Sequence, residues 1–461
     1  MNARSVSAAQ KLLLCLLMLV CLLAAISFGV RVASEYRGGL PVDMLIFRKA
    51  ALDFWQTGEL YDRPENVPHE KYIEHPYEPG APIYKFPPAF QLALAPWVKN
   101  NAVKPGTLFA WLRSIMIVLY ALSVFLMLNY FYRMYFSRKA AGAYSGLWAA
   151  RYFILPAFIG ACIFYPFFNA YQALVAEIPL LFLFLLFFLL MDKRPSMAGF
   201  FLAYSSLIKI YPAFIGLVLL YTKNRRAIIS SIVSGLLIAG FCFYYFGFTE
   251  NMFYLQEILP ALLKEPVIVE NKNLSLESWL VFHGFREQIT GSVFQSVRLL
   301  ALLYLAWQFY CLSTVKANRA VVFSLTLSVL LLCLPNYWVQ YQLFLLFPLF
   351  HLLAVSVSVN NPRLTSMVLV CFVCFVPDVS WYGKLASLSP SLQQVPVEQL
   401  ARLAIENGQA WLFWHYSKPA WVIYCIVEVR PFIPILILIL LGLHRDDLSP
   451  RDDKTEVQAI H

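Results

Sequence analysis

A carboxylate suited to proton transfer stands at Asp43, at the head of a short amphipathic pattern. Apolar residues recur near helical spacing after it, at Met44, Phe47, Ala51, Phe54 and Trp55. Gly58 then supplies a C-terminal stop signal, so we expect a helix over 44–56 that lies on a membrane surface. The residues alone leave two interpretations of Asp43 open. Its side chain caps this helix, or it acts as a base at the membrane interface.

Lys209 is the second residue of interest, because it lies inside an apolar stretch just before Pro212. A charge at that depth is costly unless it is paired or faces a wet cavity. The alternative is a lysine whose ammonium reaches the membrane interface along its own aliphatic chain. Glu177 and Glu428 are acids in similar surroundings, which pairing with a cation such as Arg430 would explain.

The elements that must position these residues are membrane-spanning helices. Hydrophobic residues make up 60% of the 461-residue chain, charged residues only 13%, and the mean hydropathy is +0.65. These values exclude a water-soluble domain. Apolar runs of about 20 residues, the length needed to cross a bilayer as a helix, recur along the sequence. A run such as 180–191 is apolar at every position, which excludes the alternating strands of a barrel.

The basic residues predict which side of the membrane each loop occupies. With a cytoplasmic N-terminus, spans are predicted at 12–30, 108–131, 152–168, 173–191, 227–247, 293–313, 320–334, 338–356, 364–380 and 419–443. Every short basic loop then falls on the cytoplasmic side. The basic loops at 193–194 and 223–226 must share that side, although about 25 residues between them are too few for two crossings of about 20 each. We therefore expect a broken helix pair over 197–221 that meets near Lys209 and Pro212.

The sequence thus predicts an all-α polytopic membrane protein of about twelve transmembrane or broken helices. A single integral-membrane domain covers 1–443, and the cytoplasmic tail 444–461 is expected to be disordered. The outer face receives the long loops 31–107, 248–292 and 381–418, and tight turns near 169–172 and 335–337. Since function concentrates in long loops on a rigid scaffold, the active face is expected to be the non-cytoplasmic one.

Other chemistries find little support in the sequence. The nine cysteines all lie in apolar stretches, so we expect no disulfide framework, and Cys371 and Cys374 are attributed to helix packing. The seven histidines form no spaced pair typical of metal sites, so no metal is predicted. The net charge of +10 comes largely from the short basic loops, and no nucleic-acid partner is expected.

Several motifs occur in a distinctive order and fall mainly on the predicted outer side. They are Asp43…Phe47…Ala50-Ala51…Gly58…Leu60-Tyr61-Asp62, Tyr84-Lys85-Phe86-Pro87-Pro88, Asn169-Ala170-Tyr171-Gln172, Gly199…Lys209-Ile210-Tyr211-Pro212, Asn273-Leu274-Ser275-Leu276 and Pro335-Asn336-Tyr337-Trp338…Tyr341. This order resembles glycosyltransferase family 87, within the GT-C superfamily of membrane glycosyltransferases. Two departures are visible: the usual glycine before Gln172 is missing, and Lys85 interrupts an aromatic and proline run.

The resemblance implies a GT-C-like fold with interfacial helices in the first outer loop. It implies a polyprenyl-phosphate sugar donor, usually mannose, and an inverting transfer to a hydroxyl of a glycan, glycolipid or protein acceptor. The lipid-linked donor is a substrate, so no cofactor is implied. The protein would lie in the inner (plasma) membrane, multi-pass, with its active face non-cytoplasmic, which is periplasmic in a bacterium.

By this resemblance Asp43 is the catalytic base, and Lys209 binds the donor phosphate. Arg298, near the outer start of its span, is a second phosphate candidate with no motif behind it. The motifs further suggest substrate-binding residues, namely Tyr84, Lys85, Gln172, Asn273 and Tyr337.

Two other classes of protein share some of these features. A secondary transporter would also have broken helices around an intramembrane charge. A lipid-linked glycan polymerase or ligase would share the outer active face. No half-to-half repeat is visible, and the long outer loop favours the enzyme.

Overall fold

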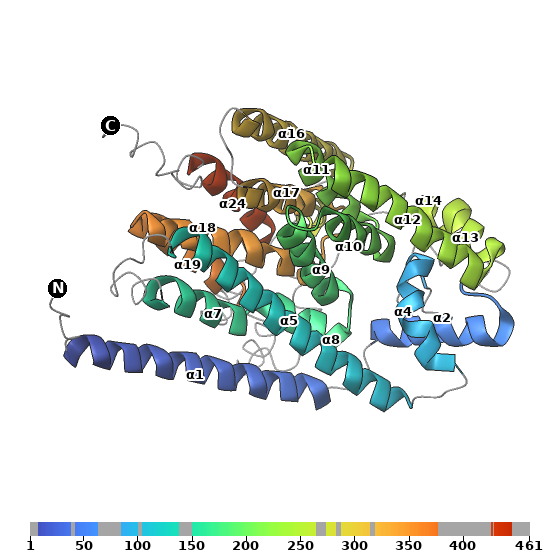
Figure 1. Ribbon diagram of the computed structural model, residues 1–461, viewed down its shortest axis with the longest axis horizontal. Helices are drawn as coiled ribbons and strands as arrows, with labels where there is room; N and C mark the ends of the chain where they lie inside the picture. The colour runs from blue at the N-terminus through green and yellow to red at the C-terminus, as the bar shows by residue number, and fades with distance from the viewer. Residues whose placement is uncertain are drawn as a thin grey trace. The chain divides into compact units, whose positions relative to one another are not determined.

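The computed structural model describes residues 8–37, 42–62, 84–99, 104–137, 150–263, 273–282, 287–313, 319–376, 426 and 428–444. Within these residues the regular elements are helices (Figure 1). The chain divides into two compact units. Unit 1 comprises Met1–Ala33, Val124–Pro166 and Val269–His461, and unit 2 comprises Ser34–Ser123 and Phe167–Ile268.

Five helical segments of the described chain are long and apolar enough to cross a membrane. They are Pro105–Tyr135, Arg151–Ala173, Arg225–Phe246, Ile289–Leu312 and Val339–Ser358. Only 11% of the apolar window in Arg225–Phe246 is buried inside the protein, against 89% in Val339–Ser358. Leu236, Leu237 and other large apolar side chains of the first segment are exposed. Lipid is the solvent that suits such a surface, so the chain is a membrane-embedded helical protein.

Unit 1 is built around two helices that are buried along most of their length, α17 (Arg319–Cys333) and α18 (Leu346–Ser358). Its elements are α1 (Ala8–Arg37, to Ala33), the last part of α5 (Pro105–Tyr135), η2 (Ala150–Ile154), α7 (Leu155–Cys162), α15 (Leu276–Phe282), α16 (Glu287–Ser313), α17 (Arg319–Cys333), η5 (Val339–Leu345), α18 (Leu346–Ser358), α19 (Pro362–Cys374), η6 (Arg430–Phe432) and α24 (Ile433–Leu443). Helix α17 packs against α16, α18 and α24. The buried His351 of α18 is held by the Tyr135 hydroxyl at 2.8 Å and the Ser324 hydroxyl at 3.0 Å. Its polar ring is thereby satisfied inside an apolar core.

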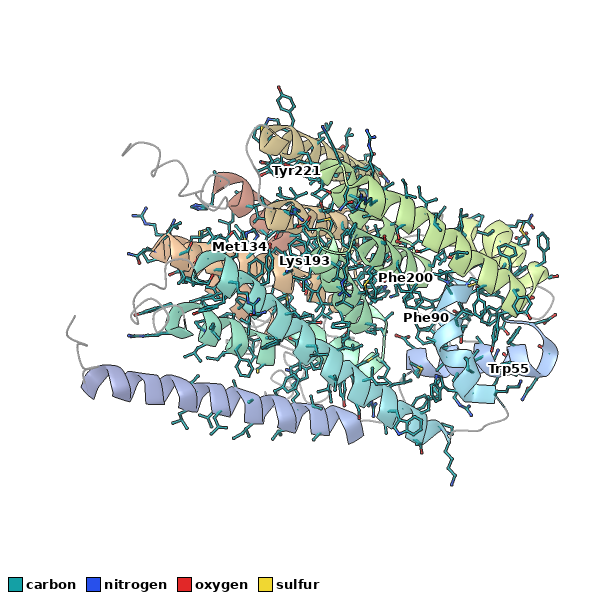
Figure 2. All side chains as sticks on the ribbon, in the orientation of Figure 1. Trp55, Phe90, Met134, Lys193, Phe200 and Tyr221 are labelled. Carbon is teal, nitrogen blue, oxygen red and sulfur yellow. The ribbon has the colours of Figure 1, made fainter. Side chains whose placement is uncertain are left out.

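Unit 2 carries the first outer loop and the broken helices. Its elements are α2 (Val42–Thr57), α4 (Pro88–Val98), the first part of α5, most of α8 (Tyr165–Ala173), α9 (Glu177–Leu190), α10 (Pro195–Ile208), η3 (Tyr211–Gly216), α11 (Leu217–Thr222), α12 (Arg225–Phe246), α13 (Phe248–Phe253), η4 (Tyr254–Ile258) and α14 (Leu259–Leu263). Helix α10 packs against both α9 and α12, and α4 packs against α2, α10 and α12. Figure 2 labels Trp55 on α2, Phe90 on α4 and Phe200 on α10.

The helix predicted over 44–56 is confirmed as α2, whereas its place on a membrane surface stays a prediction. It ends where Gly58 adopts a φ of +83°, a conformation that favours glycine, and the Gly58 N–H donates to the Phe54 carbonyl. The proline pair begins a second helix, α4, with Pro88 at its first position. The two helices are joined by hydrogen bonds from Trp55 to the Ala95 carbonyl and from Gln91 to the Phe47 carbonyl.

The predicted helix break near Lys209 is also confirmed. Helix α10 ends at Ile208, Lys209 has an extended backbone, and η3 and α11 follow. The chain then returns to the end it left, because the Asn224 amide donates to the Met191 carbonyl at 2.6 Å. The Ser230 hydroxyl likewise donates to the Ser196 carbonyl, so α10 and α12 start side by side.

The turn predicted at 169–172 is wrong. These residues lie within α8, and the chain turns instead at Leu174, whose φ is +54°. The Val175 N–H donates to the Ala170 carbonyl across this turn. The polar Asn169 and Gln172 suggested a loop, but both residue types are accommodated in a helix whose backbone bonds are satisfied internally. The turn predicted near Pro335 is confirmed, because α17 ends at Cys333 and η5 begins at Val339.

Three predicted segments lie partly or wholly outside the described residues. The outer loop 381–418 lies wholly outside them, as do parts of 31–107 and 248–292. Of the tail predicted over 444–461, the structure describes His444 alone.

A close approach between α10 and α12 generates a stability prediction. A Cβ added at Gly199 would lie 2.5 Å from the Ala227 carbonyl oxygen and 2.7 Å from the Ser231 nitrogen. Gly199→Ala should therefore push α10 from α12 and cost about 1–3 kcal/mol of unfolding free energy, the usual penalty for overpacking. Thermal unfolding in detergent measures it. Gly240→Ala is the matched control, because nothing lies within 4 Å of its Cβ position. If the two variants have the same melting temperature, the close approach of α10 to α12 at Gly199 is wrong.

Candidate functional site

The centre of the site in unit 2 is a buried ion pair between Lys209 and Glu177. The Lys209 ammonium lies 2.5 Å from Glu177 Oε1, and the two side chains are 9% and 0% exposed. Glu177 opens α9, where the helix dipole favours a carboxylate. The second carboxylate oxygen, Oε2, has no hydrogen-bond partner among the described residues. Lys209 is therefore held inside the protein and does not extend its ammonium to the surface.

Aromatic rings flank the Lys209 ammonium. Its nitrogen lies 5.1 Å from the centroid of Phe86 and 5.9 Å from that of Tyr211, both within the range of cation–π attraction. Phe86 belongs to the first outer loop and Tyr211 to the segment after the helix break. The structure thus brings two of the sequence motifs together around one cation.

Tyr84 anchors the aromatic loop to α2. Its ring stacks on Tyr61 at 5.4 Å and meets Phe47 edge-on at 6.2 Å. Its hydroxyl donates to the Pro87 carbonyl at 3.1 Å, and burial raises the pKa of Tyr84 well above its ordinary value, so the group stays a neutral donor. The neighbouring Lys85 is partly exposed. A substrate-binding role for Tyr84 or Lys85 stays a prediction.

Asp43 lies at the start of α2 but inside the helix. It is the second residue of α2, in the first turn, rather than the capping residue before it. A carboxylate there is favoured by the helix dipole by about 0.3–1 kcal/mol. Its side chain is half-buried, and its role as a base stays a prediction.

Two sets of contacts hold the turn after α2. The buried Glu250 accepts hydrogen bonds from the backbone N–H groups of Leu60 at 2.7 Å and Tyr61 at 3.3 Å. On the surface, the Lys49 ammonium contacts Asp53 at 2.8 Å and Asp62 at 2.9 Å. Partial burial lowers the pKa of Lys49, but the two carboxylates outweigh that effect and the net pKa is raised. These contacts fix the loop that carries the predicted motif.

Arg113 is a buried charge that the sequence analysis did not consider. It lies about two turns into α5, is 6% exposed, and its guanidinium carbon stands 6.0 Å above the ring of Tyr171. The available signal was an arginine inside an apolar span, which marks a functional position by default. Gln172, by contrast, is exposed at the end of α8.

In unit 1, the motifs around Asn273 and Tyr337 meet in a short antiparallel bridge. The Leu274 N–H donates to the Tyr337 carbonyl at 2.6 Å, and Asn273 pairs with Trp338 across the bridge. The Asn273 side-chain oxygen accepts from the N–H groups of Ser275 at 3.1 Å and Tyr337 at 2.9 Å. Both motif residues are buried, so the bridge fixes this part of the unit.

Arg298 is bound within its own unit. Its guanidinium donates through Nε and Nη2 to the Cys333 carbonyl at the end of α17, with the Nε distance 2.8 Å. It also lies 4.3 Å above the ring of Phe294. Its predicted phosphate contact stays a prediction. Among the described residues no group of three or more His, Cys, Asp or Glu side chains is placed to hold a metal.

The fold and these sites define a membrane protein whose buried charges sit at a helix break beside an aromatic loop. The sequence model of glycosyltransferase family 87 matches residues 84–335, more than half of the chain. The chain belongs to glycosyltransferase family 87, as its motifs predicted. It is thus a membrane glycosyltransferase. No curated protein and no solved structure matches the chain. The family match includes Tyr84, Lys209 and Arg298 but begins after Asp43.

A side-chain deletion tests the bridge. Asn273→Ala leaves two buried N–H groups without their acceptor and should cost about 2 kcal/mol or more of unfolding free energy. Glycosyl transfer per folded molecule should fall as well. Asn361→Ala is the control, because Asn361 caps α19 by accepting from the Leu364 N–H, and losing a cap costs about 1 kcal/mol. Equal activity per folded molecule in both variants would make Asn273 a purely structural residue.

Proposed function

We propose that this glycosyltransferase transfers mannose from a polyprenyl-phosphate donor to an acceptor hydroxyl at the outer face of the membrane. The observation that carries the proposal is the Lys209 ammonium, buried at a helix break and flanked by the first outer loop. A lipid-linked donor keeps its prenyl chain in the bilayer and one phosphate at the interface. A fixed cation beside an apolar surface suits such a ligand.

In the proposed reaction the acceptor hydroxyl attacks the anomeric carbon on the face opposite the phosphate. The bond between the anomeric carbon and the phosphate oxygen breaks, and its electron pair stays on that oxygen. The acceptor proton passes to the carboxylate of Asp43, a general base. One in-line displacement inverts the anomeric configuration. The products are the glycosylated acceptor and polyprenyl phosphate.

The wider assignment follows the same reasoning. We assign the chain a GT-C-like architecture of about twelve transmembrane or broken helices in the inner (plasma) membrane. The helix break supports this assignment, because the chain between Met191 and Asn224 leaves one end of its unit and returns to it. The helices α2 and α4 would then lie at the outer interface.

The base can be tested by a transfer assay. Purified protein in detergent is given radiolabelled polyprenyl-phosphate mannose and a lipid extract as acceptor source, and labelled glycosidic product is counted. Asp43→Asn keeps the side-chain shape but cannot take up a proton at neutral pH. Its rate should fall by about 10²- to 10⁴-fold, the usual cost of losing a general base, with little change in melting temperature.

Asp53→Asn is the matched control in the same helix. Asp53 pairs with Lys49 on the protein surface, where an ion pair contributes about 0–1 kcal/mol, so transfer should persist. Retention of most activity by Asp43→Asn would place the base elsewhere. A wild-type protein that forms no glycosidic product but moves substrate across vesicles would favour the transporter class instead.

The orientation is tested by reporter fusions. Fusions after Leu60 and Glu287 should report the non-cytoplasmic side, and fusions after Lys139, Arg226 and Arg363 the cytoplasm, because the basic loops favour the inner side. Alkaline phosphatase and a fluorescent protein provide opposite readouts. A cytoplasmic signal at Leu60 would overturn the outer active face.

A further inference from the structure

Tryptophan contacts join three helices of unit 2, which are α2, α4 and the start of α5. Trp55 of α2, labelled in Figure 2, donates through its indole N–H to the Ala95 carbonyl of α4 at 2.8 Å. The Lys99 ammonium, at the end of α4, lies 4.3 Å from the centroid of the Trp55 ring. Trp97 of α4 meets Trp111 of α5 edge-on, with ring centroids 6.3 Å apart. Indole rings and a lysine thus gather at one place in the unit.

Trp111 heads an exposed apolar face of α5. Exposed side chains recur there every three or four residues, at Trp111, Ile115, Val118 and Leu122, and each is between 43% and 55% exposed. They form one stripe along a helix that is long and apolar enough to cross a membrane. Lipid is the solvent that suits this stripe, so Trp111 lies toward one end of a lipid-facing surface.

Two exposed lysines lie beyond this end of the stripe. Lys104 precedes α5 directly, and its carbonyl accepts from the Leu108 N–H, so it stands about 10 Å from Trp111 along the helix axis. That rise suits the headgroup layer, which extends about 5–8 Å beyond the hydrocarbon core. Lys99 is the second exposed lysine, next to the half-exposed Trp97. Within the described part of the chain, neither ammonium belongs to an ion pair.

We propose that the surface formed by Trp97, Lys99, Lys104 and Trp111 binds anionic phospholipid headgroups and thereby anchors α2 and α4 at the membrane interface. Tryptophan rings favour the interface of any bilayer, whereas lysines beside them select lipids with a net negative charge. A second copy of the chain packed here about a two-fold axis would bring like charges together, which disfavours that occupant. The inference needs no step of the proposed reaction.

Brominated lipids test this surface, because bromine on an acyl chain quenches the fluorescence of a tryptophan that it contacts. The full chain is reconstituted in phosphatidylcholine vesicles with increasing amounts of dibrominated phosphatidylglycerol or dibrominated phosphatidylcholine. Subtracting the signal of the double variant Trp97→Phe and Trp111→Phe isolates these two rings from the remaining tryptophans. The ratio of the two half-quenching lipid fractions measures the local preference for the anionic lipid.

The tryptophan pair should prefer phosphatidylglycerol by about 5- to 25-fold, since each lysine near an anionic surface contributes about fivefold. Lys99→Gln combined with Lys104→Gln should bring the ratio to within about twofold of equality, while both lipids still quench. Lys49→Gln is the matched control, because this exposed ammonium already contacts Asp53 and Asp62, and the preference should persist. Salt gives a test without a variant: about 1 M NaCl should reduce the wild-type preference, because the Debye length falls to about 3 Å.

Three outcomes would overturn the inference. Quenching of the pair by neither lipid would place the surface outside the bilayer. An equal preference in wild type and in the double lysine variant would remove Lys99 and Lys104 from lipid selection. Displacement of brominated phosphatidylglycerol by an equimolar amount of polyprenyl phosphate would assign the surface to the sugar donor instead. Since binding is measured without glycosyl transfer, each of these outcomes leaves the test of the proposed function separate.

Discussion

The packing of unit 2 depends on one constraint, the positive charge of Lys209 inside an apolar helix pair. Moving an ion out of water costs several kcal/mol even after the protein relaxes, so Lys209 must be compensated by fixed groups. Glu177 supplies the opposite charge, and the rings of Phe86 and Tyr211 supply weaker attraction. The compensation ties together three segments, which are the start of α9, the end of α10 and the aromatic loop before α4.

The pair of helices around this buried charge, α10 and α12, is itself stabilised by close backbone packing. Gly199 lets α10 approach α12, and the Ser230 hydroxyl closes the same contact. At the same end of the two helices, Asn224 caps α12 and also donates to the Met191 carbonyl. Small and polar side chains thus replace bulky ones where helices pack in lipid, since packing and hydrogen bonds drive association there.

Local signals account for what the sequence predicted well. Gly58 ends α2 because its position needs a positive φ. The basic loops at 193–194 and 223–226 had to lie on one side of the membrane, which required the chain between them to return to that side. Contacts between distant residues carried no such signal. Nothing local indicates that Glu250 binds the turn at Leu60, or that Lys209 is the partner of Glu177. The turn at Leu174 escaped prediction because leucine has no preference for a positive φ.

The family match begins at Tyr84, so the helix that carries Asp43 stands outside it. Yet the matched part holds that helix in place. Gln91 donates to the Phe47 carbonyl, Phe47 packs against Tyr84, and Trp55 donates to the Ala95 carbonyl. In the proposed reaction the matched region holds the donor through Lys209, and α2 presents the carboxylate to the acceptor.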